Sequence, residues 1–436
     1  MKRYRQHILY LAVFAALTLS LYLLMVVSAA IPNVVLQKNM RRSAKHYIDT
    51  ERYAFAEDGV LQKVTDNHAD QMWLNIGWNM EFGNPFLAAL DTKYYDGEEF
   101  GTTAGLYLTV TRGKMANADY TRYWHGTAGV LRILHLFTDI NGIKIIGMIG
   151  LILLIWRTVS ILIHSGHWDL GICLLASLFW VQAWNLRLSV EYLPCFLICF
   201  GLCPAFLRLE KQGDIFLMLL AVICGTLTAF FDFLTTETVT ILIPLILVVA
   251  IRSRERRLDN PLQLLKLLVR CGLCWLLAYA GMFAAKWILV SLATGENHLL
   301  PAIDSAGRRV SGVVTVGQFR KKPGFLMAIA ANFSALFEGT SRTEYGPVIG
   351  TLICLIILIV FVYRINQVTQ KPRPGTGFIL LLGGVVLLRY GLLANHSYMH
   401  AFFTYRALVS TILAILAVMA LNLHPIQKGG RRSKWN

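Results

Sequence analysis

The chain has 436 residues, of which 56% are hydrophobic, and its mean hydropathy is +0.54. A membrane-spanning helix needs roughly 20 apolar residues, and the chain contains many such runs, which excludes a soluble globular protein. The formal net charge is +16, from 41 basic and 25 acidic residues. Because the basic residues cluster between apolar runs, where they set topology and meet anionic lipid headgroups, the charge does not indicate a nucleic-acid partner.

The apolar runs predict an all-α polytopic membrane protein with about ten transmembrane helices. The first lies within residues 1–30, and its apolar run is long for a cleaved signal peptide, so we expect it to remain. The other spans are expected at about 142–163, 168–186, 190–208, 214–232, 236–252, 267–293, 346–364, 376–394 and 402–423. This topology places the basic turns and both termini on one side, which the positive-inside rule makes the cytoplasm.

The polar segments divide the chain further. Residues 31–125 form an acidic first loop with amphipathic helices, which holds twelve of the acidic residues. Residues 126–293 carry spans two to seven, residues 294–345 form a second outward loop, and residues 346–436 carry the last three spans and a basic tail. All eight cysteines lie in apolar runs, so the first loop has no disulfide framework.

Two carboxylates stand out in the first loop. Asp66 and Asp70 are four residues apart, so they share one face if the segment is helical. Transfer of a sugar from a phosphate leaving group needs a carboxylate that accepts the proton of the acceptor hydroxyl, together with cations that hold the phosphate. A solvated helix face or an N-capping aspartate explains the same pattern, and both alternatives stay open.

The end of the first loop is aromatic. Tyr123, Trp124 and His125 precede a short amphipathic segment at 125–138, which predicts an in-plane helix before the second span. Tyr123 and His125 are candidates to stack on a sugar or to orient a phosphate. The interfacial aromatic belt of membrane proteins is the alternative, which we favour for Trp124.

Charged residues inside or at the rim of spans are costly, so each is a functional candidate. Arg187 and Glu191 flank the turn after the third span, where they could also pair with each other. Asp232 lies at the outer end of the fifth span, and Lys286 lies within the seventh, where snorkelling is the alternative explanation.

The last outward turn gathers Arg389, His396, His400 and Arg406 at one predicted rim. Arginine side chains suit phosphate oxygens and stay charged. Two histidines four residues apart could instead bind a metal, but no third ligand stands beside them. We therefore expect phosphate binding and no metal site, with a divalent metal left open as a cofactor. Arg308 and Arg309 could add phosphate contacts.

This layout resembles the GT-C superfamily of membrane glycosyltransferases, in which a first span, a large outward loop with an acidic catalytic residue and a many-span body follow one another. The resemblance implies a bacterial plasma-membrane enzyme that moves a sugar from a polyprenyl-phosphate donor to a cell-envelope glycan or lipid acceptor on the outer face. It implies Asp58, Asp66 or Asp70 as the catalytic carboxylate, and Lys286, Arg389, His396, His400 and Arg406 as phosphate-binding residues.

Two other functions stay open. A flippase or transporter for lipid-linked glycans predicts a polar path through both leaflets, whereas the charged candidates crowd the outer half. A non-catalytic subunit of an envelope-polysaccharide synthesis complex would use the first loop to dock partner proteins, and its carboxylates would tolerate substitution. The chain contains no phosphate-binding loop of the nucleotide-hydrolysing type, which argues against nucleotide-driven pumping.

Overall fold

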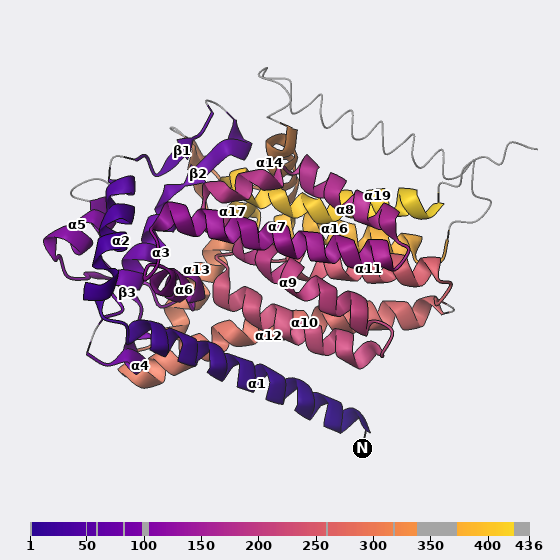
Figure 1. The fold of residues 1–436 in the computed structure, drawn as a ribbon, viewed down its shortest axis with the longest axis horizontal. Helices are drawn as coiled ribbons and strands as arrows, with labels where there is room; N and C mark the ends of the chain where they lie inside the picture. The colour runs from indigo at the N-terminus through magenta and orange to yellow at the C-terminus, as the bar shows by residue number, and fades with distance from the viewer. Residues whose placement is uncertain are drawn as a thin grey trace, which may run out of the picture.

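The computed structural model describes residues 2–48, 50–57, 60–81, 83–97, 104–258, 260–316, 319–337 and 373–422. Within these residues the fold is mostly helical, and the strands form short antiparallel sheets of two strands each. Long helices lie roughly alongside one another in a body, and the elements of the first loop gather at one end of it (Figure 1). The N-terminus lies at the opposite end of the first helix.

Six helices among the described residues are long and apolar enough to cross a membrane. Four of them are single helices: Arg5–Ala29 in α1 (Lys2–Ala29), Ile140–His164 (α7), Asp214–Phe231 (α10) and Pro261–Thr294 (α12). The span Val190–Leu209 combines η4 (Val190–Tyr192) and α9 (Pro194–Leu209). The span Ala401–Asn422 combines α18 (Ala401–Thr404), η6 (Tyr405–Ala407) and α19 (Leu408–Asn422). These helices confirm the prediction of a helical, multi-pass membrane protein.

Several predicted spans are shorter helices. They are α8 (Trp168–Trp180), α11 (Val239–Arg254) and α16 (Thr376–Leu392). The span expected at 168–186 ends early because Gln182 has a left-handed backbone with φ 52°, after which the chain continues as a 3-10 helix, η3 (Ala183–Leu188). The span expected at 346–364 lies outside the described residues, so the total of ten stays a prediction.

The first loop folds as a cluster of short elements. In chain order they are α2 (Asn33–Tyr47), β1 (Tyr53–Phe55), η1 (Leu61–Lys63), β2 (Val64–Asp66), α3 (Asn67–Trp78), α4 (Pro85–Ala88), β3 (Lys93–Tyr94), α5 (Ala104–Arg112) and β4 (Ala118–Asp119), followed by α6 (Gly126–Leu134). This segment, expected as a loop with amphipathic helices, contains several short helices, and α6 lies within the short segment expected at 125–138. The antiparallel strand pairs β1–β2 and β3–β4 were not expected.

A buried arginine holds this cluster on the body. Arg132 in α6 is fully buried and donates hydrogen bonds to the carbonyls of Ser28 (2.9 Å) and Gly77 (2.7 Å) and to Asn33 Oδ1 (2.5 Å). These acceptors belong to α1, α2 and α3. The completely buried rings of Trp73 and Trp124 fill the apolar centre of the same cluster. The first loop is therefore a packed unit, which can position side chains.

The segment expected as a second outward loop holds more structure than predicted. It contains the amphipathic helix α13 (Leu299–Ser311), the hairpin of β5 (Val314–Val316) and β6 (Phe319–Lys321), and the apolar helix α14 (Phe325–Phe337). Asn332 of α14 is completely buried, donates to the carbonyl of Ser397 (2.9 Å) and accepts from Thr404 Oγ1 (2.6 Å). The helix α14 thus packs against the last described turn and helps to shape it.

The far end of the body is basic and ion-paired. Arg252 binds Glu210 (3.2 Å) and Asp214 (3.1 Å), and Arg254 binds Asp169 (2.5 Å). These pairs join the first turn of α8, the end of α9 and the start of α10 to the last turn of α11. The predicted gathering of basic turns at one end is confirmed for the described residues, and that end lies opposite the first loop (Figure 1).

Candidate functional site

The predicted carboxylate pair lies where the first loop meets the body, and Asp70 is its fully engaged member. Asp70 is completely buried in α3. Its Oδ2 accepts from Tyr47 Oη and contacts Lys144 Nζ, each at 2.8 Å. Its Oδ1 accepts from Ser189 Oγ (2.7 Å) and from the Val190 N–H (2.8 Å). With both oxygens occupied by donors, Asp70 anchors α3 to α2, α7 and η4.

Asp66 lies in a different environment. It is the N-cap of α3, where Oδ1 accepts from the Ala69 N–H at 2.8 Å, so the capping alternative is correct for its position. Its carboxyl group also shares a hydrogen bond with that of Glu191, and burial raises the pKa of Asp66 to about 6. Two carboxyl groups in hydrogen-bonding contact cannot both ionise freely, so the pair retains one proton that the two groups share.

A second pair of carboxyl groups lies in the turn after α10. Asp232 is buried and accepts from the hydroxyl of Thr235 (2.5 Å) and from its N–H (3.0 Å). Burial and then the neighbouring charge of Glu237 raise the pKa of Asp232 to about 6. The charge of Asp232 also acts on Glu191 and on Tyr123, so this turn lies within electrostatic range of both residues.

Arg389 lies beside the turn with His396, as predicted, but its guanidinium N–H groups bind other residues of the protein. Nε and Nη2 form a two-pronged ion pair with Glu237 at 2.7 and 3.0 Å. Nη2 also donates to the Leu234 carbonyl (2.8 Å), and Nη1 donates to Ser397 Oγ (3.1 Å). The side chain therefore shapes the turn at 232–238, and a phosphate would have to compete with Glu237 for it.

His396 completes the support of the same turn. Leu234 has a left-handed backbone (φ 66°), and its carbonyl accepts from both Arg389 and His396 Nε2, each at 2.8 Å. Because a carbonyl only accepts, His396 carries its hydrogen on Nε2, and Nδ1 can accept from Arg309 Nη1 at 3.0 Å. Burial lowers the pKa of His396, so the ring is neutral.

His400 offers an unpartnered ring nitrogen beside this group. Its ring stacks on Phe403 with centroids 5.1 Å apart and lies 4.7 Å from the ring of His396. Burial, and next the charge of Arg309, lower its pKa to about 4. Its Nδ1 is buried with no hydrogen-bond partner among the described residues. An unpartnered nitrogen of a neutral imidazole can donate or accept a hydrogen bond, according to its tautomer, and so is suited to a hydroxyl group, which can do both.

Two arginines without an acidic partner gather around Tyr123. Arg309 from α13 lies 5.7 Å from its ring centroid, and Arg122 lies 5.7 Å from it and 4.3 Å from the ring of Tyr120. In the described part of the chain neither guanidinium forms an ion pair, and Arg122 Nε has no hydrogen-bond partner. We call Arg122, Arg309 and Tyr123 the cation cluster. It provides positive charge that the fold does not neutralise.

His125 and Lys286 lie at the base of the first loop. His125 Nε2 bonds the Tyr120 carbonyl at 2.6 Å, and its ring is buried, which lowers its pKa. Lys286 is completely buried in α12, donates to the Leu90 carbonyl and lies 5.5 Å from the ring of Trp124. These contacts tie loop segments to α12 and orient the backbone beside the cation cluster.

Arg406 is buried between the first loop and the last helix. It donates to the carbonyls of Phe402 (3.1 Å) and Gln62 (3.2 Å), and it lies 4.3 Å from the ring centroid of Tyr192. Its Nε has no partner among the described residues. Arg406 thus joins η1 to the body close to Asp66, whose charge acts on Tyr192.

Two predicted residues do not join this arrangement. Arg187 is exposed, and among the described residues no ion pair connects it with Glu191, which contacts Asp66 instead. Asp58 lies outside the described residues. In that same part of the chain no group of three or more histidine, cysteine, aspartate or glutamate side chains is arranged to hold a metal ion.

A polar pocket of about 260 Å³ opens next to the cation cluster. Its lining includes Arg52, His68, Gln71, Tyr120 and Arg122. Gln71 is 5% exposed, and its Nε2 has no partner within the described residues. Donors and acceptors beside aromatic faces are the groups that a sugar ring requires. Sequence reasoning missed Gln71, although it shares α3 with Asp66 and lies one residue after Asp70.

Comparison of the chain with models of protein families, with curated protein sequences and with solved structures finds no match. The function is therefore inferred from the geometry of the site. That geometry combines buried carboxyl groups, a polar pocket and unneutralised arginines at one end of a helical membrane protein.

Proposed function

We propose that the protein is a membrane glycosyltransferase that moves a sugar from a polyprenyl-phosphate donor to a cell-envelope glycan or lipid acceptor. The observation that carries the proposal is a buried carboxyl pair, Asp66 and Glu191, at the start of α3, the helix whose Gln71 lines a polar pocket together with Arg122 of the cation cluster. The layout that resembles the GT-C superfamily supports it as well. On the positive-inside rule the site faces outward, since the basic turns lie at the other end.

Asp66 is the general base in this proposal. Its carboxyl group has the backbone N–H groups of Ala69 and His68 and the carboxyl group of Glu191 as neighbours, whereas both oxygens of Asp70 are held by side-chain donors and a backbone donor. A carboxylate with a pKa of about 6 is ionised near neutral pH and is a stronger base than an ordinary aspartate. Glu191, as its hydrogen-bond partner, orients it. Asp58 stays an alternative that the described residues do not address.

The reaction follows from these positions. The acceptor hydroxyl oxygen forms a bond to the anomeric carbon while the bond from that carbon to the phosphate oxygen breaks. The hydroxyl proton passes to Asp66, and the electron pair leaves on the polyprenyl phosphate. Arg122 and Arg309 stabilise the negative charge that develops there, which is the larger catalytic contribution expected of such sites.

The other candidates take supporting roles. Arg389 and His396 hold the turn at 232–238, and the charge of Asp232 in that turn acts on Glu191. His400 offers its free nitrogen to a sugar hydroxyl, and Tyr123 presents a neutral phenol, because burial raises its pKa to about 12. Lys286, His125 and Arg406 have an indirect role, because each bonds a backbone carbonyl and so positions the segment around the site.

Transfer of radiolabelled sugar from a panel of polyprenyl-phosphate donors in membranes tests the proposal. Asp66→Asn should reduce transfer by about 100-fold or more, the usual contribution of a general base. Glu81→Gln, at an exposed carboxylate of the same loop, is the matched control and should transfer normally. Equal transfer by Asp66→Asn and the control would remove Asp66 from the mechanism. Movement of a lipid-linked glycan across vesicles without a new glycosidic bond would instead favour a flippase.

A further inference from the structure

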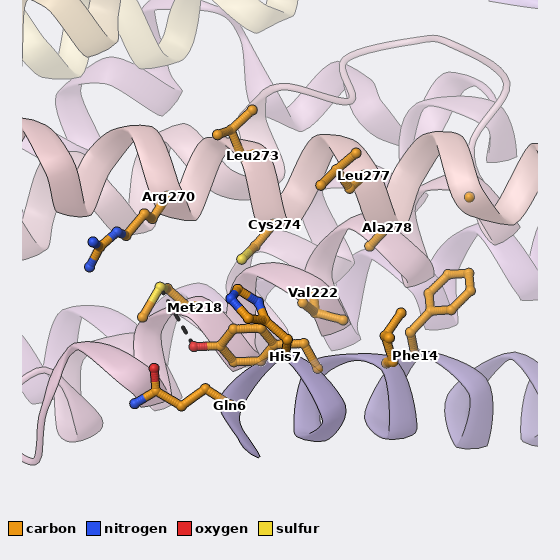
Figure 2. A pocket seen from close by; sticks show the side chains of 13 residues that line it. Gln6, His7, Phe14, Met218, Val222, Arg270, Leu273, Cys274, Leu277 and Ala278 are labelled. Carbon is orange, nitrogen blue, oxygen red and sulfur yellow. Dashed lines mark hydrogen bonds between the residues drawn. The ribbon is translucent and has the colours of Figure 1, made fainter. Parts of the chain in front are cut away.

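A second cavity lies far from the carboxyl groups, toward the basic end of the molecule. It is a groove of about 660 Å³ between α1, α10 and α12. Figure 2 shows Met218 and Val222 of α10 at its floor, with residues of α1 on one side and of α12 on the other. Tyr10 Oη contacts Met218 Sδ at 3.7 Å across the floor. Along most of its length the groove is lined by apolar side chains.

The groove has a polar end and a closed end. Gln6 and Arg270 lie at the first, and Phe14 lies at the other (Figure 2). The closed end depends on Gly281, because a Cβ there would come 3.2 Å from Phe14 Cζ. A helix rises 1.5 Å per residue, so positions 270 to 281 of α12 span about 16 Å. That is half of a hydrocarbon core of roughly 30 Å, which is the depth of one leaflet.

The polar end carries uncompensated positive charge. Arg270 is exposed and forms no ion pair in the described part of the chain, and the same holds for Arg5, which precedes Gln6 in α1. Asp214, at the start of α10, is paired with Arg252 at 3.1 Å. A basic recess between helices at the cytoplasmic surface is the kind of site that binds anionic headgroups.

We propose that this groove binds an anionic glycerophospholipid of the leaflet at the basic end of the molecule. The phosphate lies on Arg270 with Gln6 and His7 beside it, and one acyl chain runs between Tyr10 and Leu277 up to Phe14. The closure at Phe14 and Gly281 fits a chain that is one leaflet long and excludes the much longer polyprenyl tail. The site is separate from the proposed transferase site and does not depend on it.

Native mass spectrometry of the full chain, purified and mixed with defined lipids, tests this site. The wild type should retain phosphatidylglycerol in preference to phosphatidylcholine. Arg270→Gln should reduce the retained phosphatidylglycerol by about fivefold or more, since one basic residue contributes about that factor at a membrane surface. Lys266→Gln removes the same charge one turn earlier on α12, outside the groove lining, and should retain the lipid as the wild type does.

A second variant keeps the test independent of charge. Cys274→Trp places a large ring inside the groove and should abolish retention of the lipid while the protein still unfolds at the wild-type temperature. The proposal is overturned if Arg270→Gln and Lys266→Gln retain the lipid equally, or if the wild type binds both lipids alike. It is also overturned if polyprenyl phosphate displaces phosphatidylglycerol and is lost in Cys274→Trp.

Discussion

Asp66 and Asp70 show how the same side chain acquires two roles within one helical turn. Asp70 receives donors from a tyrosine, a serine, a backbone amide and Lys144, so its charge is fully compensated. Burial makes the ionised form of Asp66 less favourable, whereas the Ala69 N–H that it caps and the hydrogen bond from Glu191 favour that form. The sequence predicted that both residues share a helical segment. It could not separate their roles, because the partners come from residues 47, 144 and 189–191.

The proposed role of Asp66 as general base predicts how the rate of sugar transfer depends on pH. A general base works only when deprotonated, so the rate should fall as the pH drops below about 6, the raised pKa of this residue. Because Asp66 and Glu191 share a hydrogen bond, the observed value belongs to the pair. The hydrogen bond from Glu191 lowers the pKa of Asp66, so Glu191→Ala should move the acid limb to higher pH.

Glu191→Gln is the matched variant for that profile. Its amide can still donate to Asp66, so the acid limb should return toward the wild-type position. The measurement is the rate of sugar transfer between pH 4.5 and 8, with protein stability followed in the same buffers. An acid limb that stays in place in Glu191→Ala would show that another group controls the profile.

At the scale of elements, long apolar runs predicted their helices well, and contacts between distant segments account for the rest. The span at 142–163 and α7 (Ile140–His164) nearly coincide. Helix α14 was missed because its apolar run has only 13 residues and lies within a segment that otherwise looks like a loop. The shape of the turn at 232–238 depends on Arg389, which lies 152 positions after Glu237. No local sequence pattern around Glu237 predicts a partner so distant in the chain.

The ion pair between Arg389 and Glu237 provides a prediction about that turn. Both side chains are buried, so removing one partner leaves an unpaired charge, which typically costs about 3–5 kcal/mol. Arg389→Gln and Glu237→Gln should each lower the unfolding temperature strongly. The double variant removes both charges and should recover much of the loss, which a double-mutant cycle of unfolding in detergent measures.

The same variants separate a supporting role of Arg389 from direct phosphate binding. If Arg389 contacts the donor phosphate, Arg389→Gln should raise the KM for the donor in a protein of normal stability. If it holds the turn, stability and kcat should fall together, and the double variant should restore part of both. Additive losses of stability in the double variant would contradict the pairing described here.

The whole molecule has two chemically different ends. One end carries the acidic first loop, the carboxyl groups and the cation cluster, and the other carries the ion-paired basic turns and the lipid groove. The positions of the basic turns and of the acidic first loop in the sequence predicted this division. They could not predict that the first loop packs around Trp73, Trp124 and Arg132, because that packing joins segments about a hundred residues apart.

The orientation of these ends is the prediction for the whole molecule. The positive-inside rule places the basic turns in the cytoplasm, so the first loop should face outward. Glu81→Cys, in the first loop, should react with a membrane-impermeant maleimide on intact cells, and Lys211→Cys should react only after permeabilisation; both native residues are exposed. The wild type supplies the background, since its cysteines among the described residues are buried or half-buried. The reverse labelling pattern would put the carboxyl pair in the cytoplasm, where the donor and acceptor proposed for it do not meet.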